Sequence, residues 1–203
     1  IDLLTCDQAI HTVLLNQGAG RFTPGPSWPV TPNTGFERLA DVDGDGRLDL
    51  AVGTMPNSSL GSGVLVFPGQ PGATFGAPIH VPSVDQVWDF KPGDANGDGI
   101  ADLAITGINP VSFLVTLRWM LGHPNRLFAM HAPRTFGPTV YPDSLTVFNG
   151  NGDGLDDVAI CSSGSVYVAF TGNNVPGTGP SIQVGTTLGD HLVGADLDGD
   201  LDD

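Results

Sequence analysis

The sequence predicts an all-β fold made of about four similar units, and three observations support this prediction. Short apolar runs bounded by Gly, Pro and Asn recur along the chain, which is typical of β-strands. No window carries a sustained helical stripe, and 17 prolines oppose long helices. An Asp-rich stretch returns about every fifty residues. Several short strands per unit at this period predict β-propeller-type blades of about four antiparallel strands.

The Asp-rich stretches define the repeat. They begin at Asp41, Asp94, Asn149 and Asp196, so that consecutive starts are 53, 55 and 47 residues apart. Together they hold 15 of the 21 aspartates. We therefore interpret residues 1–203 as one domain, with repeats at 41–93, 94–148 and 149–195 and a split repeat made of 196–203 plus 1–40.

The strands expected within each repeat follow its Asp-rich loop. A first apolar run comes directly after each complete loop, at residues 50–52, 103–105 and 158–160, and a second run follows at 63–67, 112–117 and 165–170. Residues 1–6 align with 48–53, and residues 12–16 match a second run. Both chain ends are thus expected inside a repeat.

The three complete loops carry Asp or Asn at positions 1, 3, 5 and 9 and Gly at position 6. Alternate short oxygen-bearing side chains in a tight turn can converge on one cation, and Ca²⁺ takes six to eight oxygens. Position 7 would add a backbone carbonyl. The predicted ligands are Asp41, Asp43, Asp45, Arg47 and Asp49; Asp94, Asn96, Asp98, Ile100 and Asp102; and Asn149, Asn151, Asp153, Leu155 and Asp157. A fourth, degenerate site would use Asp196, Asp198 and Asp200, with Leu201 in the place of the glycine.

An EF-hand is the main competing interpretation of these loops. It requires flanking helices and a bidentate Glu at position 12. Position 12 is Val52, Ile105 or Ile160, each inside an expected strand. This excludes an EF-hand. Magnesium in place of calcium, or an Asp/Gly turn without any metal, would also suit such loops, but the many carboxylates and the in-phase copies favour calcium over both.

At these residues the sequence resembles the FG-GAP (VCBS-type) repeat family, which includes the propeller of integrin α-subunits. The loop pattern D-x-[DN]-x-D-G-x-x-D is one half of the resemblance, and Gly72-Ala-Thr-Phe-Gly-Ala-Pro78 is the other. Weaker copies of the second half lie at 18–22 and 135–138. The resemblance implies a calcium-binding propeller, and the family's ligand positions fall on the Asp and Asn residues named above.

Composition excludes some functions. A net charge of −15 with only 7 Lys and Arg argues against a nucleic-acid partner. No stretch has the apolar length of a membrane span. No nucleophile elbow, zincin motif, P-loop or dinucleotide fingerprint is present, so we expect no enzyme. The five His residues are expected at the surface or in turns. The three Trp residues could stack on sugar rings, but blade packing or a place at a strand end is favoured for them.

The two cysteines, Cys6 and Cys161, fall at equivalent places in their repeats. Equivalent points on neighbouring blades are usually too far apart for a bridge, so buried free thiols are favoured over a disulfide.

The leading functional hypothesis is a secreted or cell-surface calcium-binding module with a structural or adhesive role. Its expected partners are other copies of the chain or flanking repeats, which would complete the split repeat in a ring or a filament, and glycans or cell-surface proteins. Two hypotheses compete with it: a carbohydrate-binding lectin, and a fragment of a larger calcium-dependent polysaccharide-active enzyme.

Overall fold

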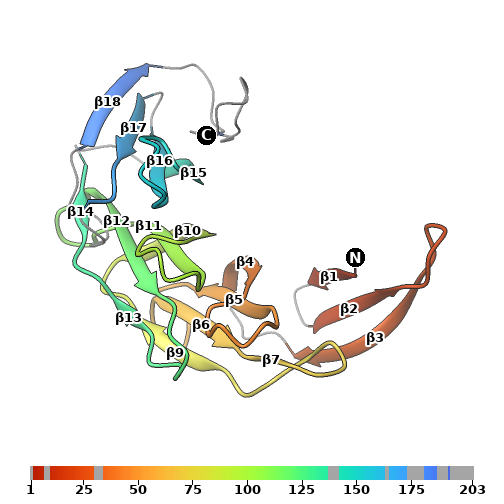
Figure 1. Ribbon diagram of the computed structural model, residues 1–203. Coiled ribbons are helices and arrows are strands. Elements are labelled where there is room, and N and C mark those ends of the chain that lie inside the picture. The colour runs from red at the N-terminus through yellow and green to blue at the C-terminus, as the bar shows by residue number, and fades with distance from the viewer. Residues whose placement is uncertain are drawn as a thin grey trace.

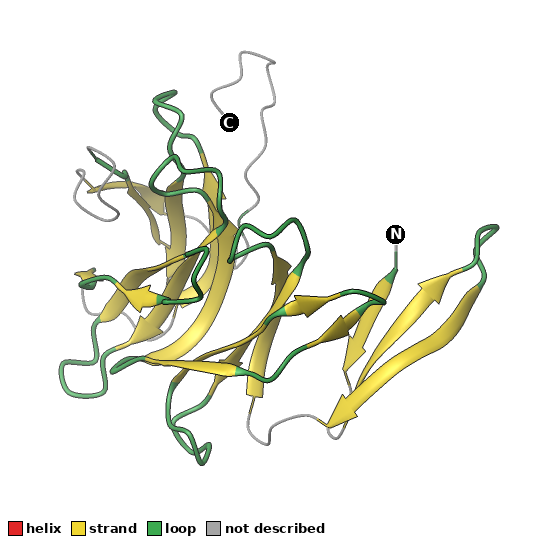
Figure 2. Cartoon of the chain, turned by 60° about the horizontal axis from the view of Figure 1, so that its bottom comes forward, coloured by secondary structure: helices red, strands yellow, loops and turns green. Residues whose placement is uncertain are grey.

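The structure is a computed structural model that describes residues 2–6, 10–29, 34–136, 142–162, 165–172, 181–186 and 192. These residues form strands and loops and no helix, which confirms the all-β prediction (Figure 2). They therefore contain no helix with the length and apolarity that crossing a membrane would require. Four main antiparallel sheets follow one another along an open arc, in the order of the sequence (Figure 1).

The second, third and fourth sheets share one plan, in which each strand pairs with the next. The second sheet contains β4 (Thr34–Ala40), β5 (Asp49–Thr54), β6 (Gly63–Phe67) and β9 (Ile79–Pro82), with a side hairpin of β7 (Gly69–Gln70) and β8 (Thr74–Phe75). The third contains β10 (Gln86–Gly93), β11 (Asp102–Ile108), β12 (Val115–Leu121), β13 (Ala129–Met130) and β14 (Arg134–Thr135). The fourth contains β15 (Pro142–Phe148), β16 (Asp157–Ser162), β17 (Ser165–Ala169) and β18 (Ser181–Thr186).

The first sheet has three described strands, β1 (Leu3–Cys6), β2 (Ile10–Asn16) and β3 (Phe22–Pro29). Register shows that β1 corresponds to β5, β11 and β16, the second strands of the other sheets. Leu3 pairs with Leu14 as Leu50 pairs with Phe67. This agrees with the predicted alignment of residues 1–6 with 48–53.

The first strand of each complete sheet lies on the inner side of the arc, and β10 packs between β4 and β15 (Figure 1). Each of the three inner pairs also has a register shift near its start, between Thr34 and Glu37, Val87 and Asp89, and Pro142 and Ser144. This shared irregularity marks the sheets as copies of one unit. Arg38 on β4 donates to Asp89 on β10 at 2.8 Å, which joins two inner strands.

The core lies between neighbouring sheets. The second strands β5, β11 and β16 are buried along their whole length. One cluster joins the second and third sheets and includes Val64, Phe90 and Ile105. Another joins the third and fourth and includes Leu117, Leu145 and Ile160. The predicted apolar runs at 50–52, 103–105 and 158–160 thus lie within buried strands.

The second half of the FG-GAP-like pattern supplies aromatic contacts between sheets. Gly72 and Ala73 have φ of 83° and 56° in the turn of the side hairpin. Phe75, which follows, packs on Trp28 of the first sheet with ring centroids 4.9 Å apart. In the third sheet Phe136 packs on Tyr167 of the fourth at 5.6 Å. Trp28 therefore takes a packing role, one of the two places expected for the Trp residues.

Two sequence expectations differ from the structure. The strand expected at 112–117 begins at Val115, because the side chain of Asn109 accepts hydrogen bonds from Val111 N and Ser112 N and holds a turn there. His11 was expected at the surface, and it is 1% exposed. Its Nε2 lies 2.6 Å from Glu37 Oε1, so it joins the first sheet to the second.

Candidate metal centre

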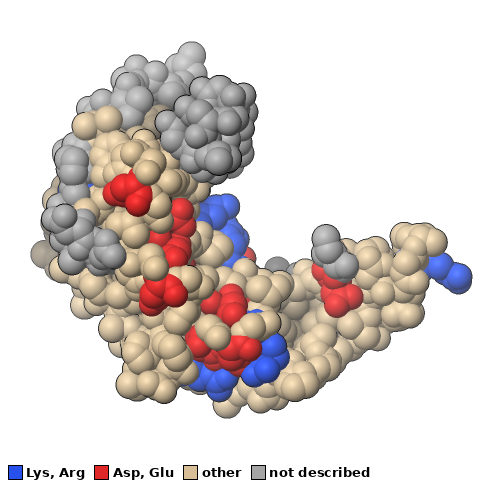
Figure 3. All heavy atoms as spheres, viewed as in Figure 1, with Lys and Arg blue, Asp and Glu red and all other residues tan. Residues whose placement is uncertain are grey.

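The three complete Asp-rich loops occupy equivalent places in the structure. Each joins the inner strand of a sheet to its second strand: residues 41–48 between β4 and β5, 94–101 between β10 and β11, and 149–156 between β15 and β16. Acidic side chains form patches that follow the arc on the face seen in Figure 3. We call these segments loops 1, 2 and 3. The fourth stretch, with Asp196, Asp198 and Asp200, lies outside the described residues.

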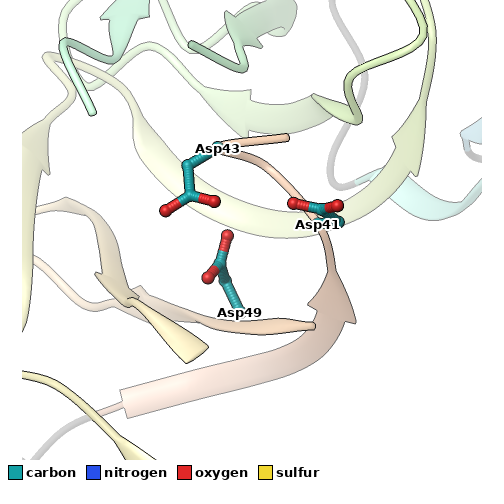
Figure 4. A group of neighbouring side chains, drawn as sticks. All are labelled: Asp41, Asp43 and Asp49. Carbon is teal, nitrogen blue, oxygen red and sulfur yellow. The ribbon is translucent and has the colours of Figure 1, made fainter. Parts of the chain in front are cut away.

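Loop 1 gathers carboxylates around one point. Asp41, Asp43 and Asp49 each place an oxygen within 4.8 Å of the others, and their carboxylates point toward one another (Figure 4). Among the described residues, this is the one group of three or more acidic, His or Cys side chains so arranged. Asp43 and Asp49 are buried, and Asp45 lies beside them at the loop tip.

Hydrogen bonds from the loop backbone to the aspartate side chains hold the turn of loop 1. Asp41 Oδ2 accepts from Gly46 N at 2.8 Å and Asp45 Oδ1 accepts from Arg47 N at 3.0 Å. Gly44 and Gly46 have φ of 69° and 82°, a region that glycine adopts without strain. Position 4 therefore needs glycine as much as position 6 does.

Loop 2 repeats both of these ties, and loop 3 repeats the one at position 5. Gly99 N donates to Asp94 Oδ2 at 2.9 Å and Ile100 N to Asp98 Oδ1 at 2.8 Å. In loop 3, Asp153 N donates to Asn151 Oδ1 and Leu155 N to Asp153 Oδ1, both at 2.9 Å. The predicted ligands of each complete loop thus belong to one turn, and among the described residues only loop 1 brings three carboxylates within 4.8 Å of one another.

The aspartate at position 9 has a second, structural contact that the sequence did not reveal. In loop 2, Asp102 Oδ2 accepts from Ala95 N at 3.0 Å and Oδ1 accepts from Gly122 N at 2.8 Å. Asp49 makes the same pair of contacts with Val42 and Gly69, and Asp157 with Gly150 and Thr171. One carboxylate therefore ties the start of its own loop to the end of the third strand.

Burial of these carboxylates changes their ionisation. The pKa of Asp102 is raised to about 7, chiefly by desolvation and in part by the charges of Asp98 and Asp94, which together outweigh the lowering effect of the two backbone donors. Desolvation also raises the pKa of Asp49 and Asp157, with added repulsion from neighbouring aspartates. A cation in the loop would lower this electrostatic cost.

Arginine side chains are the cations that face loop 1. Arg126, from the segment between β12 and β13, donates from Nε to Asp43 Oδ2 at 2.6 Å and lies 3.5 Å from Asp45 Oδ2. Arg47 pairs with Asp45 and also donates to Gly69 O at 3.2 Å. Arg47 was predicted to contribute only its carbonyl. Arg126 was missed, because it is 83 residues from Asp43 and carries no local pattern.

Successive loops contact one another directly at equivalent positions. The N–H at position 8 of each following loop donates to the carbonyl at position 1 of the loop before it: Ala101 N to Asp41 O at 3.1 Å, and Asp156 N to Asp94 O at 2.9 Å. The side chain at position 7 covers the glycine at position 4 of the preceding loop, as Ile100 covers Gly44 and Leu155 covers Gly97. We call this repeated pair of contacts the loop-to-loop junction.

Loop 3 offers an oxygen that has no other use in the structure. Asn149 Oδ1, at position 1, is buried and has no hydrogen-bond partner among the described residues. Buried polar atoms are nearly always paired, so an unpaired oxygen at a predicted ligand position fits a bound cation. The donor set of all three loops, carboxylate, amide and backbone carbonyl oxygens, is the set that calcium prefers.

The prediction that the cysteines are buried and not bridged can be checked for Cys161 only. Cys161 is buried and forms no disulfide within the described part of the chain. The side chain of Cys6 lies outside the described part of the structure.

Comparison with known proteins supports the same family. Residues 41–105, which hold loops 1 and 2 and the strands between them, match the model of the FG-GAP-like repeat. This confirms the FG-GAP-type resemblance that the loop pattern predicted. A search of curated proteins finds no match to the chain.

Proposed function

We propose, from the premise that residues 41–105 form an FG-GAP-like repeat, that this chain is an extracellular calcium-binding module with a structural or adhesive role and no catalytic activity. The convergence of Asp41, Asp43 and Asp49 within 4.8 Å carries the proposal. Three buried or half-buried carboxylates so close together repel one another unless a cation lies between them. Calcium bound by each loop would fix the connection between the inner and second strands.

The ligands follow from the loop positions. Loop 1 would hold calcium with Asp41, Asp43, Asp45 and Asp49 and the Arg47 carbonyl, and loops 2 and 3 with the equivalent residues. The number of carboxylates among positions 1, 3, 5 and 9 falls from four to three to two from loop 1 to loop 3. Since fewer carboxylates lower calcium affinity where rigidity is similar, we expect affinity to fall in the same order.

Thermal melts and calorimetry test the proposal. In calcium the protein should melt well above its midpoint in EDTA, because an ion that binds only the folded state stabilises it. Asp45→Ala, Asp98→Ala and Asp153→Ala each remove one loop's position-5 ligand, and titration of these variants should show one site fewer. Equal midpoints in EDTA and calcium would refute calcium binding as the basis of stability, and magnesium serves as the matched ion.

The extracellular and adhesive parts of the proposal rest on the family and the surface charge. At a net charge of −15 the chain has an acidic surface, which calcium from outside the cell would partly neutralise. Cell-surface proteins and glycans are the expected partners.

A lectin is the second candidate, and one feature favours it. A hollow of about 320 Å³ between the first and second sheets is lined by the aromatic rings of Trp28, Phe67 and Phe75, together with Pro29, Gly76 and Pro78. Trp28 Nε1 is buried and has no hydrogen-bond partner among the described residues. A sugar ring could stack on these rings and accept that N–H. A glycan array with the wild type and Gly76→Leu, which would fill the hollow, tests it: binding lost in the variant supports a lectin, and no binding by the wild type refutes it.

A further inference from the structure

Asparagine directly precedes glycine at three places in the sequence, and all three lie in loops 2 and 3: Asn96, Asn149 and Asn151. At such a place the backbone nitrogen of the glycine can attack the side-chain amide of the asparagine, because glycine has no Cβ to hinder the approach. The attack leads to deamidation. Since the three Asn-Gly dipeptides are alike in sequence, the structure around each glycine N–H determines which of them reacts in the folded chain.

Asn96 is protected by the hydrogen bond of the glycine that follows it. Gly97 N donates to Asp94 Oδ1 at 2.7 Å. This bond must break before the nitrogen can attack, and a carboxylate acceptor makes the bond stronger than one to a neutral oxygen. The folded loop 2 therefore keeps the nucleophile away from the amide of Asn96.

Asn149 is protected in the same way by a different carboxylate. Gly150 N donates to Oδ2 of the buried Asp157 at 3.1 Å. Both residues of this dipeptide are half-buried, which also limits the access of hydroxide to the N–H. The first asparagine of loop 3 is therefore expected to stay intact while the chain is folded.

Asn151 lacks this protection. Gly152 N has no hydrogen-bond partner among the described residues, and both Asn151 and Gly152 are exposed. The comparison with loop 2 explains the difference. There, position 1 is the carboxylate of Asp94, which accepts from the N–H at position 4. In loop 3 position 1 is Asn149, whose Oδ1 accepts no hydrogen bond, so the N–H at position 4 stays open.

The amide of Asn151 is also held in a reactive form. Its Oδ1 accepts from Asp153 N at 2.9 Å, and its Nδ2 donates to Asp153 Oδ2 at 3.0 Å. Negative charge develops on Oδ1 as the nitrogen attacks, and a donor already placed at that oxygen stabilises it. Loop 2 has the equivalent donor, Asp98 N to Asn96 Oδ1 at 2.9 Å. The open N–H of Gly152 is therefore the feature that separates the two loops.

We propose that Asn151 is a site of spontaneous deamidation in the folded chain. Hydroxide takes the proton of Gly152 N, the nitrogen bonds to Asn151 Cγ, and the bond from Cγ to Nδ2 breaks. Nδ2 gains a proton and leaves as ammonia, which leaves a five-membered succinimide. Water then adds to one of the two ring carbonyls and opens the ring to aspartate or to isoaspartate. No oxidant or reductant takes part.

The two products have opposite effects on loop 3. Aspartate gives the loop a carboxylate at position 3, as Asp43 does in loop 1, and raises its number of carboxylates at positions 1, 3, 5 and 9 from two to three. Isoaspartate adds a carbon to the backbone between residues 151 and 152, which displaces Asp153 from its hydrogen bonds. The consequence for calcium affinity rests on the proposed function, whereas the deamidation does not.

Peptide mapping by mass spectrometry tests the proposal. The full chain is incubated in EDTA at mildly alkaline pH, folded and in urea, and aspartate and isoaspartate are measured at each Asn-Gly dipeptide. In the folded chain Asn151 should react about ten-fold faster than Asn96 and Asn149, because a hydrogen bond to a carboxylate protects the other two. In urea the three rates should converge.

Asn149→Asp is the matched variant, because it supplies at position 1 the acceptor that Asp94 supplies in loop 2. It should slow deamidation of Asn151 about ten-fold in the folded chain and leave the rate in urea unchanged. Intact Asn151 in the folded wild type, equal rates at the three asparagines, or an unchanged rate in Asn149→Asp would each overturn the proposal.

Calorimetric titration of Asn151→Asp separates this proposal from the proposed function. The variant imitates the aspartate product and should bind calcium in loop 3 several-fold more tightly than the wild type. If Asn151 deamidates as expected while Asn151→Asp binds calcium no better than the wild type, calcium binding by loop 3 fails and the modification site stands.

Discussion

Gly122 follows β12 at a point where loops 1 and 2 meet, and replacing it with alanine should weaken the packing of both loops. A Cβ at Gly122 would lie 2.7 Å from Ile100 Cγ2 and 2.8 Å from Val42 O, and it would also meet Ala101 O. Val42 belongs to loop 1, and Ile100 and Ala101 belong to loop 2. Two of the three obstacles are backbone oxygens, which cannot rotate away.

The size of the effect follows from these contacts. Overpacking a well-packed site costs about 1–3 kcal/mol. A shift of residue 122 would also lengthen the 2.8 Å bond from its N–H to buried Asp102, which adds about 1–2 kcal/mol. The sum of about 2–5 kcal/mol corresponds to a fall in Tm of about 4–20 °C for a chain of this length.

Thermal unfolding in EDTA measures the structural part, and calorimetric titration in calcium measures the loss of affinity. Gly76→Ala is the matched control, because its nearest neighbour is the flexible side-chain atom Gln70 Nε2 at 3.0 Å. In the fourth sheet the equivalent residue is Thr171, which has a side chain. Its hydroxyl donates a hydrogen bond to Asp156 O at 2.7 Å, which offsets the close approach. Alanine at residue 122 has no hydroxyl and cannot form this bond. A Gly122→Ala protein as stable as Gly76→Ala would refute the reasoning.

Three further predictions concern charge, pH and coupling between loops. Arg126→Ala should raise the calcium affinity of loop 1 about two- to five-fold, because calcium then displaces no ion pair from Asp43, and calorimetry that finds unchanged or weaker binding would contradict this. In EDTA, the free energy of unfolding should fall as pH rises from about 4 to about 7, because folded Asp102 with its raised pKa keeps a proton that the unfolded chain has lost. The full effect is about 4 kcal/mol, and melting temperatures that stay constant over this range would argue against it. Ile100→Ala keeps the position-7 carbonyl of loop 2 but removes the side chain that covers Gly44, so it should weaken calcium binding in loop 1 as well as in loop 2. If site-resolved titration finds an effect in loop 2 alone, the loops bind calcium independently.

Sequence reasoning identified the elements whose causes are local. The Asp-rich loops could be predicted because Asp, Asn and glycine at fixed spacing determine a turn by themselves, and the positive φ of Gly46 and Gly99 follows from that turn. The second strands could be predicted because a short apolar run bounded by turn residues is typical of a buried strand. Both features repeat, so each copy supported the others.

Features that depend on residues far apart in the chain could not be read. Nothing near Arg126 shows that it faces Asp43, and nothing near His11 shows that Glu37 pairs with it across two sheets. The contact of Asp102 with Gly122 is also invisible, because the same aspartate is expected as a ligand for a different reason. The pairing of strands and the packing of sheets determine which residues meet in these contacts. A sequence pattern indicates the strands of one repeat but not which residues of different repeats lie side by side.

The loop-to-loop junction makes the row of loops a short one-dimensional lattice. Consecutive described loops share a backbone hydrogen bond and a covered glycine, so order in one loop lowers the entropy that its neighbour must lose. In such a lattice an interior member is held from two directions and an end member from one. As calcium is withdrawn, the row should therefore fray from its ends inward, and a longer row should respond over a narrower range of calcium concentration than a single loop can.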